Sequence, residues 1–95
     1  MPVRIDREDN GSKGRFVIYV DDKFAGKMTY VWAGTSKFII DHTELEESFG
    51  GRGLGRELVM KAVEYARHNT VKIMPLCPFG KKVFDRDDAI HDVLA

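Results

Sequence analysis

At residues 50–56 the sequence reads Gly50-Gly51-Arg52-Gly53-Leu54-Gly55-Arg56, and at this stretch the spacing of apolar side chains changes. Before it, apolar residues recur at every second position, which is typical of strands. After it, they recur at helical spacing, at Leu54, Leu58, Val59, Ala62, Val63 and Ala66. The glycine-rich stretch therefore joins a region of strands to an amphipathic helix. We expect this helix from Gly53 to His68, with Asn69 in a left-handed position at its end.

Several strands are predicted before the glycine-rich stretch. Runs of β-branched and aromatic residues are separated by turn residues, with Phe24, Gly26, Met28, Tyr30 and Trp32 in strict alternation. Because the connections are short, neighbouring strands are expected to form an antiparallel meander. The expected strands are residues 16–20, 24–32 and 38–45, with residues 3–7 as an added edge strand.

A further strand at residues 71–77 follows the helix, with Pro75 indicating a bend or an edge. Strand, helix and strand at this spacing form a βαβ unit, so this strand should run parallel to residues 38–45. Two short helical pieces are expected in the tail, at residues 79–84 and from Asp87 onward. The predicted fold class is α+β, a mixed and mostly antiparallel sheet covered by one main helix.

Length and composition narrow the classes of protein. The 95 residues predict a single domain over residues 1–95, and 15 basic residues balance 15 acidic ones without a basic patch for nucleic acid. One cysteine, Cys77, excludes an intrachain disulfide and a cysteine-rich metal site. The N-terminus is charged, and no apolar run approaches the ~20 residues that cross a bilayer. We expect a cytoplasmic protein with no metal, no nucleic-acid partner and no membrane partner.

The glycine-rich stretch has the features of an anion site. Its four glycines permit close approach of a phosphate to the backbone, at a helix start where amide groups lack partners. Arg52 and Arg56 would add countercharge. The spacing fits neither a Walker A loop, since Arg56 and Glu57 follow Gly55, nor a Rossmann fingerprint. The alternatives are an ordinary strand-to-helix turn and two solvated surface arginines.

The stretch resembles the pyrophosphate loop of the GNAT superfamily, Gln/Arg-x-x-Gly-x-Gly/Ala, with matches at Gly53 and Gly55 and with Gly50 at the first position. Two further segments are similar to a branch of small GNAT proteins of about this length. They are Asp41-His42-Thr43-Glu44-Leu45 before the loop and Met74-Pro75-Leu76-Cys77-Pro78-Phe79 after it. The resemblance runs from about residue 16 to residue 84.

The resemblance implies an acetyl-CoA-dependent N-acetyltransferase with a truncated GNAT-like fold. The acetyl acceptor would be an amine, and a protein amine is one candidate. The alternatives are a non-catalytic module that binds CoA or acyl-CoA, and an interaction domain without a cofactor. In the family, acetyl-CoA enters where the two parallel strands splay apart. The cofactor-binding residues implied here are Thr43, Leu45, Gly50, Gly51, Arg52, Gly53, Leu54, Gly55 and Arg56.

The resemblance also implies that the acetyl group lies near Cys77, His42 and Glu44. Cys77 would act as an acetyl-accepting thiolate or as a proton donor to departing CoA, and its alternative is a buried apolar residue. His42 and Glu44 alternate onto one face of their strand, with Thr43 on the other. Either could be the general base that an amine nucleophile needs. The alternative for His42 is a histidine hydrogen-bonded within the sheet.

Overall fold

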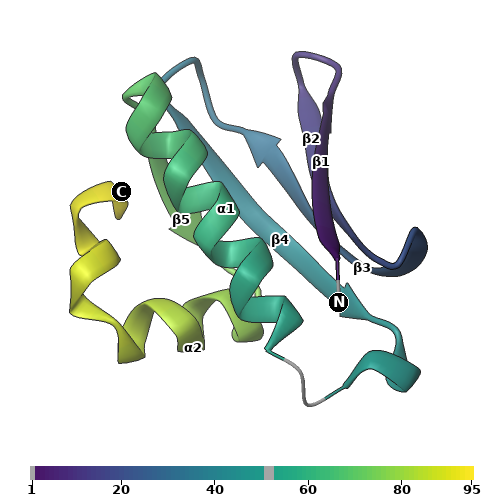
Figure 1. Ribbon diagram of the computed structural model, residues 1–95. Coiled ribbons are helices and arrows are strands. Elements are labelled where there is room, and N and C mark those ends of the chain that lie inside the picture. The colour runs from purple at the N-terminus through teal and green to yellow at the C-terminus, as the bar shows by residue number, and fades with distance from the viewer. Residues whose placement is uncertain (1, 51–52) are drawn as a thin grey trace.

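The computed structural model describes residues 2–50 and 53–95, so the predictions for Gly51 and Arg52 lie outside the described residues. Five strands form one sheet in the order β1-β2-β3-β4-β5 (Figure 1). The first four pair antiparallel, and β4 and β5 pair parallel, as predicted. The strands are β1 (Val3–Asp9), β2 (Lys13–Val20), β3 (Lys23–Trp32), β4 (Lys37–Leu45) and β5 (Lys72–Pro75).

The helical elements follow the predicted order with one addition. The main helix α1 spans Leu54–Asn69, and α2 (Pro78–Arg86) and the 3-10 segment η2 (Asp88–Val93) form the tail. A short 3-10 turn, η1 (Glu47–Phe49), precedes the glycine loop and was not predicted. The α+β class with one main helix is confirmed. The β5 strand lies at the sheet edge, which fits a proline as its last residue.

The core lies between α1 and one face of the sheet. The helix buries the apolar positions that its periodicity marked, and fully burying one such leucine or valine contributes roughly 1.5–3 kcal/mol. The sheet contributes Phe16, Ile18, Val20, Met28, Tyr30, Phe38 and Ile40. The end of α1 differs from expectation, because Thr70 takes the left-handed conformation at φ 55°. Asn69 stays in the helix, where its side-chain amide donates to the Tyr65 carbonyl at 2.9 Å.

A bulge in β4 decides which residues face α1. Tyr30 pairs with Ile40 and Thr29 pairs with His42, so Asp41 is an extra residue without a partner in the ladder. Strict alternation after the buried Ile40 would put His42 and Glu44 on the α1 face. The extra residue reverses the alternation, and Thr43 instead pairs with the fully buried Met28 on that face. His42 and Glu44 therefore lie on the opposite face.

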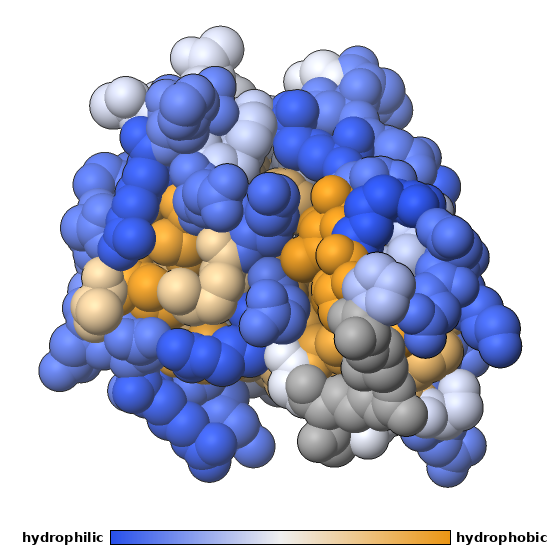
Figure 2. Space-filling view, viewed as in Figure 1, coloured by the Kyte–Doolittle hydropathy of each residue, from blue (hydrophilic) through white to orange (hydrophobic). Residues whose placement is uncertain are grey.

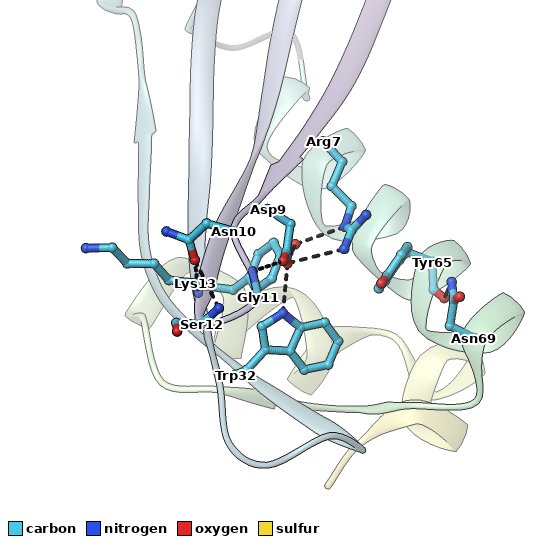
Figure 3. Close-up of polar contacts among 10 residues, drawn as sticks. Arg7, Asp9, Asn10, Gly11, Ser12, Lys13, Trp32, Tyr65 and Asn69 are labelled. Carbon is cyan, nitrogen blue, oxygen red and sulfur yellow. Dashed lines mark hydrogen bonds and ion pairs between the residues drawn. The ribbon is translucent and has the colours of Figure 1, made fainter.

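The N-terminal hairpin is tied to the rest of the sheet through Asp9 (Figure 3). One carboxylate oxygen accepts from the Tyr30 hydroxyl at 2.6 Å and from the Trp32 indole at 2.7 Å, and the Arg7 guanidinium lies 3.2 Å away. The guanidinium also lies over the Tyr65 ring of α1, 4.1 Å from its centroid. Arg7 and Asp9 thus connect β1 to β3 and to the helix.

The surface beside β1 is furrowed. A hollow lined by Val3, Ile5, Met60 and other residues lies between β1 and α1, and Figure 2 shows apolar side chains along this furrow. Within residues 2–50 and 53–95, no helix combines the length and the apolar character needed to cross a bilayer.

Candidate active site

The parallel strands stop pairing at Ile40, and β4 has an unpaired edge from there on. The Ile40 carbonyl accepts from both the Leu76 and the Cys77 amides, at 3.0 and 3.1 Å. Beyond this point β4 continues to Leu45 in register with β3 alone, while the chain after β5 turns into α2. Residues 41–45 therefore form an edge of β4 that no described strand covers on the β5 side, which we call the unpaired edge.

Cys77 lies where the unpaired edge begins. The residue is 4% exposed, and its Sγ lies 3.2 Å from Thr43 Oγ1 on β4. The same sulfur accepts a hydrogen bond from the Gly80 amide at 3.2 Å and so caps the N-terminus of α2. Cys77 thus has a structural role as a helix cap and also contacts a residue of the predicted cofactor site.

The N-terminus of α1 offers unpaired donors. The first intrahelical bond described runs from the Glu57 amide to the Gly53 carbonyl, and among the described residues no side chain caps this end of the helix. Amide groups of the first helical turn, at residues 54–56, have no intrahelical acceptor by geometry. Gly53 takes a left-handed conformation at φ 73°, and no atom of the described residues apart from its chain neighbours lies within 4 Å of where its Cβ would be. An anion can approach such an end, which the helix dipole also favours.

Gly55 has a different reason to be glycine. It is buried, and a Cβ there would lie 2.3 Å from Phe79 Cζ and 2.6 Å from Phe79 Cε2. The aromatic ring of α2 therefore packs directly on the backbone of the first turn of α1. Because Phe79 is only two residues after Cys77, this contact brings the start of α1 and the start of α2 to the same end of the sheet (Figure 1).

Arg56 is engaged by an acidic residue of the tail. Its Nη2 donates to Asp87 Oδ2 at 2.8 Å, and Asp87 Oδ1 accepts from the Ala89 amide at 3.0 Å. The hydrogen bond from Arg56, followed by that from Ala89, holds the pKa of Asp87 below its ordinary value. Arg56 is therefore near the helix start, as expected, but its charge is balanced by Asp87.

His42 and Glu44 face away from Cys77. Glu44 lies 3.8 Å from Lys27 Nζ, and the His42 side chain is exposed without a hydrogen bond to any residue that the structure describes. On the same face, Asp41 accepts from the Thr29 hydroxyl at 2.6 Å. Asp41 and Thr29 line an open hollow of about 580 Å³ that extends toward Asp9 and Arg15. This hollow lies on the face opposite α1.

The structure thus divides the predicted site residues into two groups. Thr43 contacts Cys77, and Gly53 to Arg56 lie at the helix start that Phe79 joins to α2. Leu45 ends the unpaired edge and packs against the core, whereas Gly50 closes η1 by donating to the Glu47 carbonyl at 3.1 Å. His42 and Glu44 form the second group, on the far face of β4. No group of three His, Cys, Asp or Glu side chains suited to a metal ion occurs among the described residues.

Two residues near the site were not singled out from the sequence. In the sequence Phe79 is part of the segment Met74 to Phe79, and its aromatic side chain two positions after Cys77 is the signal that could identify it. In the sequence Asp87 only begins the last predicted helical piece. Its contact with Arg56 joins residues 31 positions apart, which no local pattern reveals.

Comparisons with known proteins identify the fold. The family model described as GCN5-related N-acetyl-transferase matches residues 15–93. A GCN5-like protein from Staphylococcus aureus is 30% identical over 95% of this chain and 87% of its own, with a TM-score of 0.71. No curated protein sequence matches the chain.

Two more distant structures share the fold alone. A GNAT family acetyltransferase from Elizabethkingia anophelis, described with acetyl-CoA bound, is 12% identical and has a TM-score of 0.70, with 88% of this chain and 72% of that chain covered. The IAA acetyltransferase of Bacillus cereus is 13% identical, with a TM-score of 0.70 and coverage of 90% and 75%. The family match extends over most of the chain, and the chain therefore belongs to the GCN5-related N-acetyltransferase family.

Proposed function

We propose that this protein transfers the acetyl group of acetyl-CoA to an amine. The family match supports this reaction class, and the Elizabethkingia protein of the same fold is described with acetyl-CoA bound. The observation that carries the proposal is the unpaired edge of β4, because Cys77 lies at its start and the helix terminus of α1 is joined to the same place through Phe79.

The cofactor site follows from the donors available. The pyrophosphate of acetyl-CoA binds at the N-terminus of α1, where the amides of residues 54–56 have no intrahelical acceptor. Its pantetheine lies along the unpaired edge, where the backbone from Thr43 to Leu45 offers groups that no strand takes up. This assignment directs the thioester toward Thr43 and Cys77.

The chemistry is a direct transfer. The neutral amine attacks the thioester carbonyl carbon, a C–N bond forms, and a backbone amide stabilises the oxygen as it gains negative charge. Collapse of this intermediate breaks the C–S bond and releases CoA as a thiolate. The amine nitrogen loses one proton to a base and CoA gains one, so the products are an acetylated amine and CoA thiol. His42 or Glu44 takes the proton from the amine, and the Cys77 thiol supplies one to CoA.

The acceptor approaches from the face of the sheet opposite α1 and reaches the thioester at the unpaired edge, where no described strand separates the two faces. His42 is exposed there, and the hollow beside Asp41 is open to solvent. The segment from Asp41 to Glu47 also carries Glu44 and Glu46, so it attracts a cationic group. A protein lysine or another exposed amine fits this face better than a small enclosed substrate.

The test combines binding with turnover. Native mass spectrometry of the freshly purified protein should show bound CoA or acetyl-CoA, and acetyl transfer to a mixed peptide library should be measurable. His42→Gln should lower kcat about 100-fold, which is the lower end of the effect expected when a general base is removed. Glu44→Gln should have a smaller effect. His68→Gln, on the surface of α1, is the matched control. CoA binding without transfer to any amine would favour the binding module, and no CoA binding would contradict both functions.

A further inference from the structure

The ion pair between Arg56 and Asp87 lies within one turn of the proposed pyrophosphate site. Arg56 is the third residue of α1, and Gly53 immediately precedes the helix. Its guanidinium is the described cation nearest in sequence to the helix terminus that the proposed function assigns to phosphate. The structure nevertheless directs one of its nitrogens to Asp87, at 2.8 Å.

Asp87 is held in this position by its own contacts. One carboxylate oxygen caps η2 by accepting from the Ala89 amide at 3.0 Å, which leaves the other oxygen to face Arg56. The Asp87 amide donates to the Phe84 carbonyl at 3.4 Å at the end of α2. The Asp87 side chain is 21% exposed, whereas that of Arg56 is 52% exposed. The carboxylate is thus the fixed partner of the pair, and the guanidinium is the movable one.

The Asp87 carboxylate and a bound phosphate are alternative partners of the Arg56 guanidinium. Arginine recognises both of these oxyanions, the planar carboxylate and the tetrahedral phosphate, through paired N–H groups. We propose that Asp87 competes with the cofactor pyrophosphate for Arg56 and so holds the affinity for CoA below the value that the helix terminus and a free arginine would give. This inference rests on the proposed function, since it concerns the same cofactor site.

If Asp87 competes for Arg56, removing the negative charge of Asp87 should increase the affinity for CoA. Asp87→Asn keeps a side-chain oxygen for the Ala89 amide and removes the negative charge. The dissociation constant for CoA, measured by isothermal titration calorimetry at low salt, should fall roughly fivefold, the effect of one screened unit charge a few ångströms from a phosphate. Added salt should reduce the gain. Asp87→Ser, which also caps a helix start, should give the same gain and serves as a second variant if the asparagine variant folds poorly.

Two controls separate competition from a general change in charge. Asp88→Asn removes a neighbouring carboxylate that is 96% exposed and lies 3.7 Å from His91 Nδ1, so CoA affinity should stay within twofold. In an Arg56→Gln background, Asp87→Asn should lose most of its effect. Dephospho-CoA keeps the pyrophosphate and lacks the 3′-phosphate, and it should show the same gain as CoA.

Each contrary result has a distinct meaning. If the wild type binds CoA and Asp87→Asn leaves the affinity unchanged or weakens it, the competition is wrong while the proposed function stands. The same holds if Asp88→Asn tightens binding equally. A gain confined to CoA and absent with dephospho-CoA would overturn the assignment to the pyrophosphate. If the wild type binds no CoA at all, the proposed function itself fails.

Discussion

The ring of Phe79 occupies the space in which a side chain at Gly55 would begin, 2.3 Å from the position of a Cβ. This contact joins the first turn of α1 to the first turn of α2. It also gives a packing reason for Gly55, whereas the sequence suggests that this glycine lets a phosphate approach the backbone. Of the two glycines that match the family pattern, Gly53 faces open space and Gly55 faces an aromatic ring.

Gly55→Ala should therefore destabilise the protein although alanine favours helices. A methyl group in this contact forces the ring or the helix to move, and such overpacking costs about 1–3 kcal/mol. In a Phe79→Ala background, Gly55→Ala should be neutral or stabilising, because the ring is gone. Urea unfolding of the four proteins of this double-mutant cycle measures the coupling. Equal effects of Gly55→Ala in both backgrounds would show that the ring does not determine this position.

Gly53 provides the cleaner test of the phosphate site. Asparagine and aspartate both tolerate its left-handed conformation and have the same shape, and a Cβ there meets no atom of the other described residues within 4 Å. Gly53→Asn should bind CoA nearly as well as the wild type. Gly53→Asp should weaken binding at least tenfold, or about 1.4 kcal/mol, because its carboxylate repels phosphate. A negative charge at a helix start favours folding, so the aspartate variant should be at least as stable as the asparagine variant, which urea unfolding checks. Equal affinities in the two variants would place the phosphate elsewhere.

Local patterns predicted most of the fold, because each element carries its own periodicity. The alternation from Phe24 to Trp32 and the helical spacing after Gly53 lie in β3 and α1, and β4 ends at Leu45 as expected. The bulge at Asp41 could not be predicted, since it depends on the register between β3 and β4 and not on the composition of β4.

That single extra residue decides the layout of the site. The sequence correctly put His42 and Glu44 on one face and Thr43 on the other. It could not tell which of the two faces meets the helix, because the bulge reverses the alternation between Ile40 and Thr43. Cys77 therefore contacts Thr43, and the two candidate bases lie across the strand from it.

The carboxylate of Asp9 should make stability depend on pH in the acid range. Burial raises the pKa of Asp9, but the hydrogen bonds from Tyr30, Gly11 and Trp32 and the charge of Arg7 outweigh it, so the pKa lies below its ordinary value of 3.8. Near this pH the unfolded chain binds more protons than the folded one, so stability rises with pH. The contribution of the Asp9 carboxylate to stability is complete when the pH is above the ordinary aspartate pKa. It is lost as the pH falls through the pKa of Asp9 in the folded state.

Asp9→Asn should accordingly lower the melting temperature at pH 7. The expected decrease is about 4–8 °C for each kcal/mol by which the free energy of unfolding falls. The gap to the wild type should narrow steadily below pH 4, as the wild-type carboxylate becomes protonated. Asp6→Asn, on the same strand with a side chain 48% exposed, is the control and should change stability by less than about 0.5 kcal/mol. A gap that stays constant from pH 7 to pH 3 would mean that the charge of Asp9 does not stabilise the fold.

Cys77 can be tested as a cap and as a proton donor separately. Its sulfur accepts from the Gly80 amide and lies 3.2 Å from Thr43 Oγ1. Serine is among the preferred N-cap residues and alanine is not. Cys77→Ser should therefore keep α2 intact, whereas Cys77→Ala should lose about 1 kcal/mol of stability, measured by urea unfolding. Both variants should bind CoA within about twofold of the wild type, because the phosphates bind at α1.

The transfer rate then decides the chemical role. A serine hydroxyl is a much weaker acid than a thiol, so Cys77→Ser should lower kcat at least tenfold if Cys77 supplies the proton to CoA. Saturating CoA should also slow alkylation of Cys77 by iodoacetamide in the wild type, since the thioester end of the cofactor lies against it. A serine variant with wild-type kcat would limit Cys77 to capping α2 and leave direct attack to His42 or Glu44. Alkylation at equal rates with and without CoA would place the thioester away from Thr43 and Cys77, because a sulfur at the start of the unpaired edge cannot stay equally accessible once the pantetheine fills that edge.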